Sequence, residues 1–181
     1  VYNISTTHTP GFEANIDQKD YTQARKNFLW FGGTGAVLKG LDRVLDVFDQ
    51  RDDISLYVCG PIRNNNDFFE LYEYVLYENE NIHPMGWTDI RSSRFKRLTE
   101  KCGYILYPSA TEGSSGAIAA CRWRGVVPIV TKEVLAETDG WGVTMPDDSL
   151  STIESVVTEY SQIDPDELAA MTEANYEAAR T

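Results

Sequence analysis

Residues 27–50 read NFLWFGGTGAVLKGLDRVLDVFDQ, and this stretch decides the fold. It opens with a short, aromatic-rich apolar run over 27–31 that two glycines close, which is the pattern of a buried strand entering a turn. Over 39–50 the apolar residues recur at helical spacing with charged residues between them, and this spacing predicts an amphipathic helix. The stretch is therefore a strand, a glycine-rich turn and a helix.

The same unit recurs along the rest of the chain. Further strands are expected at 54–59, 82–85, 104–107, 126–130 and 141–145. Helices are expected at 68–76, 92–101, 114–124 and from Leu150 onward, where Pro165 divides two of them. Strands that alternate with helices predict an α/β fold, a Rossmann-like parallel sheet with helices on both faces. Ligands of such sheets bind beyond the carboxyl ends of the strands, which selects the loops 32–39, 60–66, 86–92 and 109–116.

The composition allows one domain and argues against several classes of site. At 181 residues the chain has room for one α/β domain with a real core. A formal net charge of −12 argues against a nucleic-acid partner, because such proteins concentrate positive charge. Three cysteines without a CxxC pair and two distant histidines predict no metal site and no Cys–His catalytic pair. Free thiols, no membrane-length apolar run and no signal-peptide pattern favour the cytoplasm.

The beginning of the chain differs from the rest. Residues 1–26 are polar and show no period, so we expect a linker between domains or a lead-in rather than core. The folded domain is then expected over 27–181. The chain shows no internal repeat and no low-complexity segment.

The first loop, 32–40, carries enough glycine to bring backbone amides close to a phosphate. It fails the dinucleotide-binding fingerprint, because Leu38 stands where the third glycine is needed. It also fails the P-loop pattern, because Lys39 precedes its glycine and no Ser or Thr follows. Lys39 stands at the mouth of the predicted helix, where a phosphate would meet a cation and unpaired N–H groups. It could equally be a solvated surface lysine.

The fourth loop, 108–116, puts Glu112 at a strand exit, just before a helix of small residues that Ser114 or Ser115 can cap. In one interpretation Glu112 only complements the helix dipole, a surface effect of about 0.3 to 1 kcal/mol. In the other, Glu112 accepts hydrogen bonds from ligand hydroxyls while the amides of 113–116 hold an anion.

Five motifs in this order resemble the C-terminal, donor-binding domain of the retaining family-four glycosyltransferases of the GT-B fold (glycosyl transferases group 1). The motifs are the strand 28–32 with Lys39–Gly40, the strand ending in Gly60, the strand ending in Gly86–Trp87, Pro108–Ser109 with Glu112–Gly113, and Gly125 with 127–130. The resemblance extends from Phe28 to the end of the chain. It implies a Rossmann-like domain that is one half of a GT-B fold.

The resemblance also implies a donor site. Lys39 would contact the donor diphosphate, Glu112 the donor sugar, and the amides just after Glu112 the distal phosphate, so Lys39 and Glu112 are the catalytic candidates. The loop at Gly86 and Trp87 would line the base pocket. The expected donor-binding residues are Gly32, Gly33, Thr34, Gly35, Lys39, Gly60, Gly86, Trp87, Glu112, Gly113, Ser114, Ser115, Gly116 and Ala120.

The family's reaction moves a sugar from a nucleotide-diphosphate sugar to an acceptor hydroxyl with retained anomeric configuration, usually without a metal. The resemblance therefore implies a nucleotide sugar as substrate, no cofactor, and a role in polysaccharide or glycoconjugate synthesis. The partner would be an N-terminal acceptor-binding domain of the same protein, and this chain alone would be inactive. Peripheral contact of the full-length protein with the inner face of a membrane stays open.

Two positions depart from the family pattern. Gly33 stands where the family usually has an arginine, and Ala120 where it has a second glutamate that binds the nucleotide ribose. Arg63, Arg91 and Arg94 either replace the lost cation or form surface salt bridges. These departures keep open a non-catalytic Rossmann-like nucleotide-binding or regulatory module, whereas a nucleotide-sugar epimerase of similar fold is disfavoured.

Overall fold

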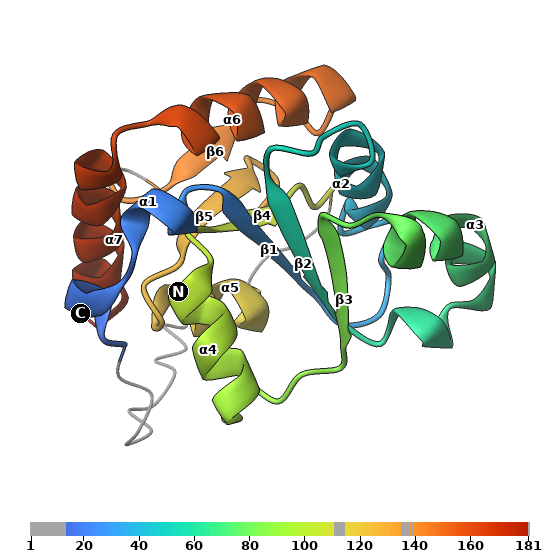
Figure 1. The fold of residues 1–181 in the computed structure, drawn as a ribbon, viewed down its shortest axis with the longest axis horizontal. Helices are drawn as coiled ribbons and strands as arrows, with labels where there is room; N and C mark the ends of the chain where they lie inside the picture. Colours follow the sequence, from blue (N-terminus) through green and yellow to red (C-terminus); the bar gives the residue numbers. More distant parts are fainter. Residues whose placement is uncertain (1–13, 111–114, 135–137, 139, 181) are drawn as a thin grey trace.

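The computed structural model describes residues 14–110, 115–134, 138 and 140–180, and its centre is a six-stranded sheet. The strands lie in the order β3-β2-β1-β4-β5-β6, and each neighbouring pair is parallel. Their bounds are β1 Asn27–Phe31, β2 Ser55–Cys59, β3 Ile82–Gly86, β4 Tyr104–Tyr107, β5 Val127–Thr131 and β6 Val143–Met145. Helices cover both sides of the sheet (Figure 1), so the predicted Rossmann-like α/β fold is confirmed.

Two groups of helices pack on the sheet. Their bounds are α1 Tyr21–Ala24, α2 Leu41–Phe48, α3 Asn66–Glu78, α4 Ser93–Lys101, α5 Gly116–Arg122, α6 Leu150–Gln162 and α7 Pro165–Arg180, with short 3₁₀ turns η1 Ile16–Gln18 and η2 Ile62–Asn64. α2 contacts α3 and α6, whereas α1 contacts α4 and α7, and α5 contacts α7. The two groups lie on opposite sides of the sheet (Figure 1), as right-handed crossovers between parallel strands require.

The central strands are buried on both faces, which is why their sequences are continuously apolar rather than alternating. In β1, Phe28, Leu29 and Trp30 are 0% exposed, and all of β4 is buried. β3 carries Pro84, which an edge strand tolerates because it bonds to a neighbour on one side only. The core therefore runs through the middle of the sheet.

The lead-in contributes to the core, contrary to the expectation from its sequence. It contains η1 and α1, and α1 contacts α4, α7 and β1. Ala24 is 1% exposed, and the buried Lys19 donates from Nζ to the carbonyls of Thr99 (3.2 Å) and Gly125 (3.0 Å). The prediction that residues before β1 stay outside the core is therefore wrong for Ala24 and Lys19. A four-residue helix is too short to show a period, and a lysine that is buried among carbonyl acceptors still looks polar in the sequence.

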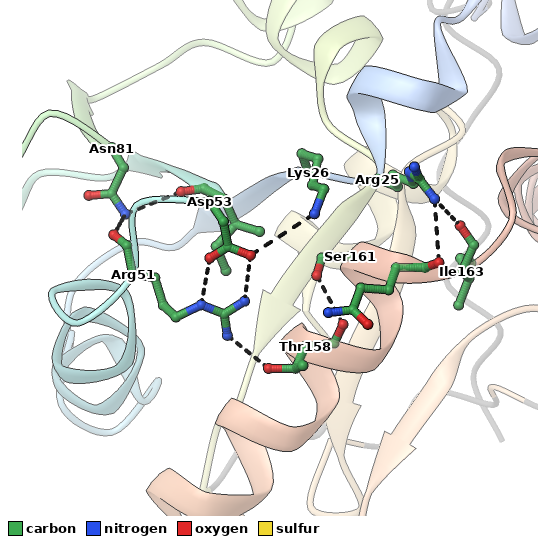
Figure 2. Close-up of polar contacts among 10 residues, drawn as sticks. Arg25, Lys26, Arg51, Asp53, Asn81, Thr158, Ser161 and Ile163 are labelled. Carbon is green, nitrogen blue, oxygen red and sulfur yellow. Dashed lines mark hydrogen bonds and ion pairs between the residues drawn. The ribbon is translucent and has the colours of Figure 1, made fainter.

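A polar network occupies the amino edge of the sheet, opposite the loops that follow the strands (Figure 2). Arg51 forms a two-pronged ion pair with Asp53 (2.7 and 2.8 Å) and donates to Oγ1 of Thr158 on α6 (2.8 Å). Nδ2 of the buried Asn81 donates to three backbone carbonyls between the end of α2 and the start of β2, at 2.7 to 3.2 Å. These contacts are structural, and they fix the strands from the edge that carries no candidate loop.

Candidate functional site

Backbone hydrogen bonds join the loops at the carboxyl edge of the sheet. The Gly32 amide donates to the last residue of β2, and the Gly60 amide donates to the last residue of β3, each at 3.0 Å. On the other side of β1, the Ala110 amide donates to the Leu38 carbonyl at 3.0 Å. The loops that leave β1, β2, β3 and β4 therefore lie side by side, which brings the predicted motifs to one edge.

Two glycines of the first loop are required by close approach. A Cβ atom on Gly32 would lie 2.5 Å from the ring of Trp30. Gly40 has a φ of +69°, and a Cβ there would lie 2.4 Å from the carbonyl oxygen of Pro108. Gly33 differs, because no atom lies within 4 Å of a Cβ placed on it. The backbone around Gly33 therefore leaves room for the arginine that the family pattern has at this position.

Lys39 lies just before α2, which begins at Leu41. Its backbone is held on both sides, because its amide donates to the Gly35 carbonyl (3.1 Å) and its carbonyl accepts from Nε1 of Trp30 (3.1 Å). The side chain is half-buried, and its Nζ lies 6.0 Å from the centroid of the Tyr107 ring at the end of β4. The lysine is thus placed beside the exit of β4, where the fourth loop begins.

The start of α5 is capped by one of the two serines expected to do so. The Oγ atom of Ser115 accepts from the Ile118 amide (3.4 Å), and the helix begins at Gly116. A cap of this kind stabilises a helix by about 0.5 to 2 kcal/mol. The predicted residues Glu112, Gly113 and Ser114 lie outside the described residues.

The described residues line two hollows near the carboxyl edge, the second of which extends along α3. The turn hollow, about 330 Å³, is lined by Gly33, Thr34, Gly35, Ala36, Pro61, Ile62, Asn64, Asn65, Asn66 and Asp67. The α3 hollow, about 310 Å³, is lined by Val58, Gly60, Pro61, Ile62, Arg63, Asn64, Phe69, Leu76, Tyr77, Pro84, Gly86 and Trp87. Both volumes reach the lower end of the roughly 300 to 1,000 Å³ that ligand pockets have.

The hollows divide the predicted donor-binding residues. The turn hollow takes Gly33, Thr34 and Gly35, and the α3 hollow takes Gly60, Gly86 and Trp87. Gly32, Lys39, Ser115, Gly116 and Ala120 line neither of these two hollows. Ala120 is 7% exposed and packs in the hydrophobic core, so a carboxylate at this position would lose most of its hydration.

The α3 side of the second hollow is absent from the sequence-based prediction. Phe69 and Tyr77 project from α3, and Asn64 lies in the turn η2 before it. The two aromatic residues are separated by about two helical turns, which is the spacing of one helix face. This spacing is the only feature of the sequence that relates Phe69 to Tyr77, and by itself it indicates a packed helix face rather than a binding site.

The three candidate arginines have different surroundings. Arg63 lines the α3 hollow, and its Nε donates to the Tyr77 hydroxyl at 3.0 Å. Its guanidinium carbon lies 5.4 Å from the centroid of the Phe69 ring and 5.1 Å from that of Tyr77. Arg91 forms a surface ion pair with Asp89 (3.3 Å), and Arg94 is exposed on α4. Arg63 is therefore the arginine that the structure places at a cavity.

The three cysteines are buried free thiols. Burial raises the pKa of Cys59 to about 11, and it also raises the pKa values of Cys102 and Cys121, so all three thiols are protonated at neutral pH. Within the described part of the chain, no group of three His, Cys, Asp or Glu side chains is arranged to hold a metal ion. No helix in that part combines the length and the apolar character needed to cross a membrane.

A six-stranded parallel sheet with helices on both faces and ligand-sized hollows at its carboxyl edge is a Rossmann-like α/β architecture. Comparison with solved structures gives the same result. HepE from Anabaena, in complex with UDP and glucose, superposes with a TM-score of 0.71 at 13% identity over 87% of this chain and 44% of that chain. WaaG, a glycosyltransferase involved in lipopolysaccharide biosynthesis, superposes with a TM-score of 0.66 at 17% identity over 100% of this chain and 50% of that chain.

A third similar structure is the catalytic domain of cholesterol-α-glucosyltransferase from Helicobacter pylori, with a TM-score of 0.64 at 13% identity over 84% of this chain and 96% of that chain. The first three matched chains are longer, and this chain spans 44%, 42% and 32% of them. No protein-family model matches the chain, and a search of curated proteins finds no relative. The comparisons confirm the predicted GT-B-type fold.

Proposed function

We propose that this chain is the donor-binding half of a retaining, family-four glycosyltransferase. The full-length protein then moves a sugar from a nucleotide-diphosphate sugar to an acceptor hydroxyl in polysaccharide or glycoconjugate synthesis. The observation that supports the proposal is the joined carboxyl edge, where the glycine-rich turn lines one ligand-sized hollow and Gly60, Gly86 and Trp87 line another. HepE, which has this fold, has been solved with UDP and glucose and with UDP-glucose.

Lys39 has the chemistry needed for the departing diphosphate. When the bond to the sugar breaks, negative charge develops on the diphosphate and must be met by a cation or by N–H dipoles. Lys39 lies in the same loop, after Ala36, which is the last residue of this loop to line the turn hollow, and its Nζ is 6.0 Å from the centroid of the Tyr107 ring at the end of β4. In the proposal the diphosphate lies along Gly33–Gly35 and Lys39 supplies the cation.

In this proposal Glu112 contacts the donor sugar, and the amides of 113–116 contact the distal phosphate. The structure describes the residues that flank this segment. Ala110 is bonded to Leu38 of the first loop, and Ser115 caps α5. These contacts concern only the described residues on either side of 111–114, so the roles of Glu112 and of the amides after it rest on the family resemblance.

The proposal assigns no general base to this chain. The acceptor and much of the catalytic machinery come from the N-terminal domain in this fold family. Positioning two reactants in a closed cleft lowers the activation free energy of a reaction by roughly 7 to 11 kcal/mol. We therefore expect the chain alone to bind donor nucleotides weakly and to transfer no sugar.

A non-catalytic nucleotide-binding or regulatory module is the second candidate. Two positions favour it, because Gly33 supplies no cation and Ala120 is buried where the family pattern has a ribose-binding glutamate. The two candidates differ in turnover. Released nucleotide from a panel of nucleotide sugars, measured with this chain and with its full-length parent, separates them.

The test of the binding site is calorimetry with UDP, GDP and ADP on Lys39→Ala. The variant loses a charge-assisted hydrogen bond of about 1.5 to 3 kcal/mol. Its affinity for the preferred nucleoside diphosphate should therefore fall about 10- to 150-fold, and the domain should stay folded. Lys96→Ala, which removes an exposed lysine on α4, is the matched control and should change nothing. Equal affinities for the folded Lys39→Ala and Lys96→Ala proteins would make Lys39 a surface residue.

A further inference from the structure

Six exposed side chains form one stripe along α3, which we call the outer face. They recur at helical spacing, while the other side of the helix buries Phe68 and Leu76. The six residues are Asp67, Glu70, Leu71, Tyr74, Tyr77 and Glu78. α3 packs against β3, η2 and α2, and it lies at the end of the molecule opposite α7 (Figure 1). The outer face therefore points away from the rest of the described structure.

The middle of the outer face is apolar. Leu71 and Tyr74, one helical turn apart, are 74% and 75% exposed, the two largest values among the large hydrophobic side chains of the described residues. Tyr77 follows one turn later and is 45% exposed. A single exposed apolar residue needs no explanation, but three in one contiguous row indicate an interaction surface. Tyrosine is also enriched in protein interfaces, where it supplies much of the binding free energy.

Carboxylates flank this apolar row without a cation to balance them. Residues 64–90 contain six acidic residues and no lysine or arginine, so this segment carries −6 of the formal net charge of −12. Among the described residues, no ion pair involves Asp67, Glu70 or Glu78. Glu78 also lies in the last turn of α3, where the helix dipole disfavours a carboxylate. The charge of the outer face is therefore complementary to a cationic partner.

We propose that the outer face of α3 docks a helix of another protein, one whose apolar stripe is flanked by lysine and arginine. The apolar row follows one helix axis, and the surface that matches a single straight row is the stripe of a second helix. Its apolar side chains would pack against Leu71 and Tyr74, and its cations would meet the flanking carboxylates. A second copy of this chain fits poorly, because a two-fold contact sets the carboxylates of one α3 against those of the other. An anionic membrane surface is repelled by the same charge.

The outer face is separate from the proposed donor site. Glu70, Leu71 and Tyr74 line neither the turn hollow nor the α3 hollow. Asp67 and Tyr77 each border one hollow, so they stay unchanged in the experiment. Docking at this face does not depend on the function proposed above, and its loss should leave nucleotide affinity unchanged.

The experiment is fluorescence anisotropy with a helical peptide of about five turns that has leucine at the a and d positions of a heptad and lysine elsewhere. The double variant Glu70→Gln/Tyr74→Ser should weaken peptide binding at least about 10-fold, because it removes the central aromatic ring and one flanking charge. The matched control is Leu150→Ser/Glu154→Gln, an exposed apolar and acidic pair at the same spacing on α6, and it should bind like the wild type. A peptide with glutamate in place of lysine should not bind.

The single variants separate the apolar and the electrostatic contributions. Tyr74→Ser should weaken binding about 5- to 30-fold at both low and high salt, as the loss of a central aromatic side chain does. Glu70→Gln should weaken it about 2- to 5-fold at low salt and less at high salt, because salt screens an exposed pair of charges. Both side chains are exposed, so the thermal melts of these variants should match that of the wild type.

Four other outcomes would overturn the assignment. The first is no peptide binding by the wild type. The second is equal weakening by the α3 and α6 double variants, which would reduce the binding to a general attraction between a basic peptide and an acidic protein. A wild-type dimer in sedimentation velocity that Tyr74→Ser dissociates would assign the face to a second copy. Binding to phosphatidylcholine vesicles that Tyr74→Ser abolishes would assign it to a lipid surface.

Nucleotide titration of the double variant keeps docking distinct from donor binding. Unchanged nucleotide affinity together with lost peptide binding is the expected result. If the folded variant also loses nucleotide affinity, the outer face belongs to the donor site and the docking assignment fails. Failure of the wild type to bind any nucleotide would overturn the function proposed above and leave the result for the peptide standing.

Discussion

Gly33→Arg is expected to tighten nucleoside-diphosphate binding by this chain. The substitution restores the residue that the family pattern has after the first strand, and no atom lies within 4 Å of a Cβ at this position. Gly33 is also not among the glycines with a positive φ, so the backbone accepts a side chain without strain. A charge-assisted hydrogen bond to the diphosphate contributes about 1.5 to 3 kcal/mol, and ordering the new side chain costs about 0.5 to 1.5 kcal/mol. The midpoints of these two ranges leave a net gain of roughly 1.25 kcal/mol, or about 8-fold in affinity.

The assay is calorimetric titration of UDP, GDP and ADP at low and high salt, with Gly33→Gln as the matched control. Glutamine makes the same backbone change and adds a polar side chain of similar reach without the charge. The gain from arginine should be largest at low salt, because salt screens exposed charges. Thermal melts should show no loss of stability for either variant. If folded Gly33→Arg binds no more tightly than Gly33→Gln, the turn does not hold the diphosphate and the reasoning fails.

Three further predictions concern buried positions. Ala120→Glu should lower the free energy of unfolding by more than about 2 kcal/mol, because it buries a carboxylate at a position that is 7% exposed. Urea titration measures this free energy. Unchanged stability together with tighter nucleotide binding would instead place the ribose beside α5. Asn81→Ala should cost about 2 to 3 kcal/mol in the same titration, because three backbone carbonyls lose their donor. For Lys19, burial lowers the pKa from 10.5 to about 8, so the unfolded chain binds more protons between these values and stability rises with pH across that window. The stability of wild-type minus that of Lys19→Met should therefore increase by about 3 kcal/mol from pH 8 to pH 10.5; a flat difference would show that Lys19 is not desolvated.

The alternation of strands and helices could be predicted from the sequence because it depends on local periods. A strand that is buried on both faces needs a continuous apolar run, and a helix that covers it needs apolar residues at helical spacing. The ends of elements were less certain. The helix predicted from Lys39 begins at Leu41 because Gly40 has a left-handed backbone, and the helix predicted from Ser114 begins at Gly116 because Ser115 caps it.

Part of the site also follows from sequence and topology. In a parallel sheet the loops after the strands lie at one edge, so Gly32, Gly60 and Gly86 had to come close once their strands were recognised. The structure joins neighbouring strand ends through backbone hydrogen bonds, from the Gly32 amide to the Cys59 carbonyl and from the Gly60 amide to the Gly86 carbonyl. The roles of Lys39 and Glu112 stay predictions from the family resemblance.

Only the tertiary structure decided which side chains share a cavity. Arg63 and Tyr77 lie on η2 and α3, and their pairing depends on how the loop between them folds against the edge of the sheet. The burial of Lys19 likewise depends on carbonyls from Thr99 and Gly125, which are distant in the chain. Periodicity reports whether a face is apolar, but it carries no information on which distant groups meet that face. The fold class was therefore determined by the sequence, whereas the composition of the hollows came from packing.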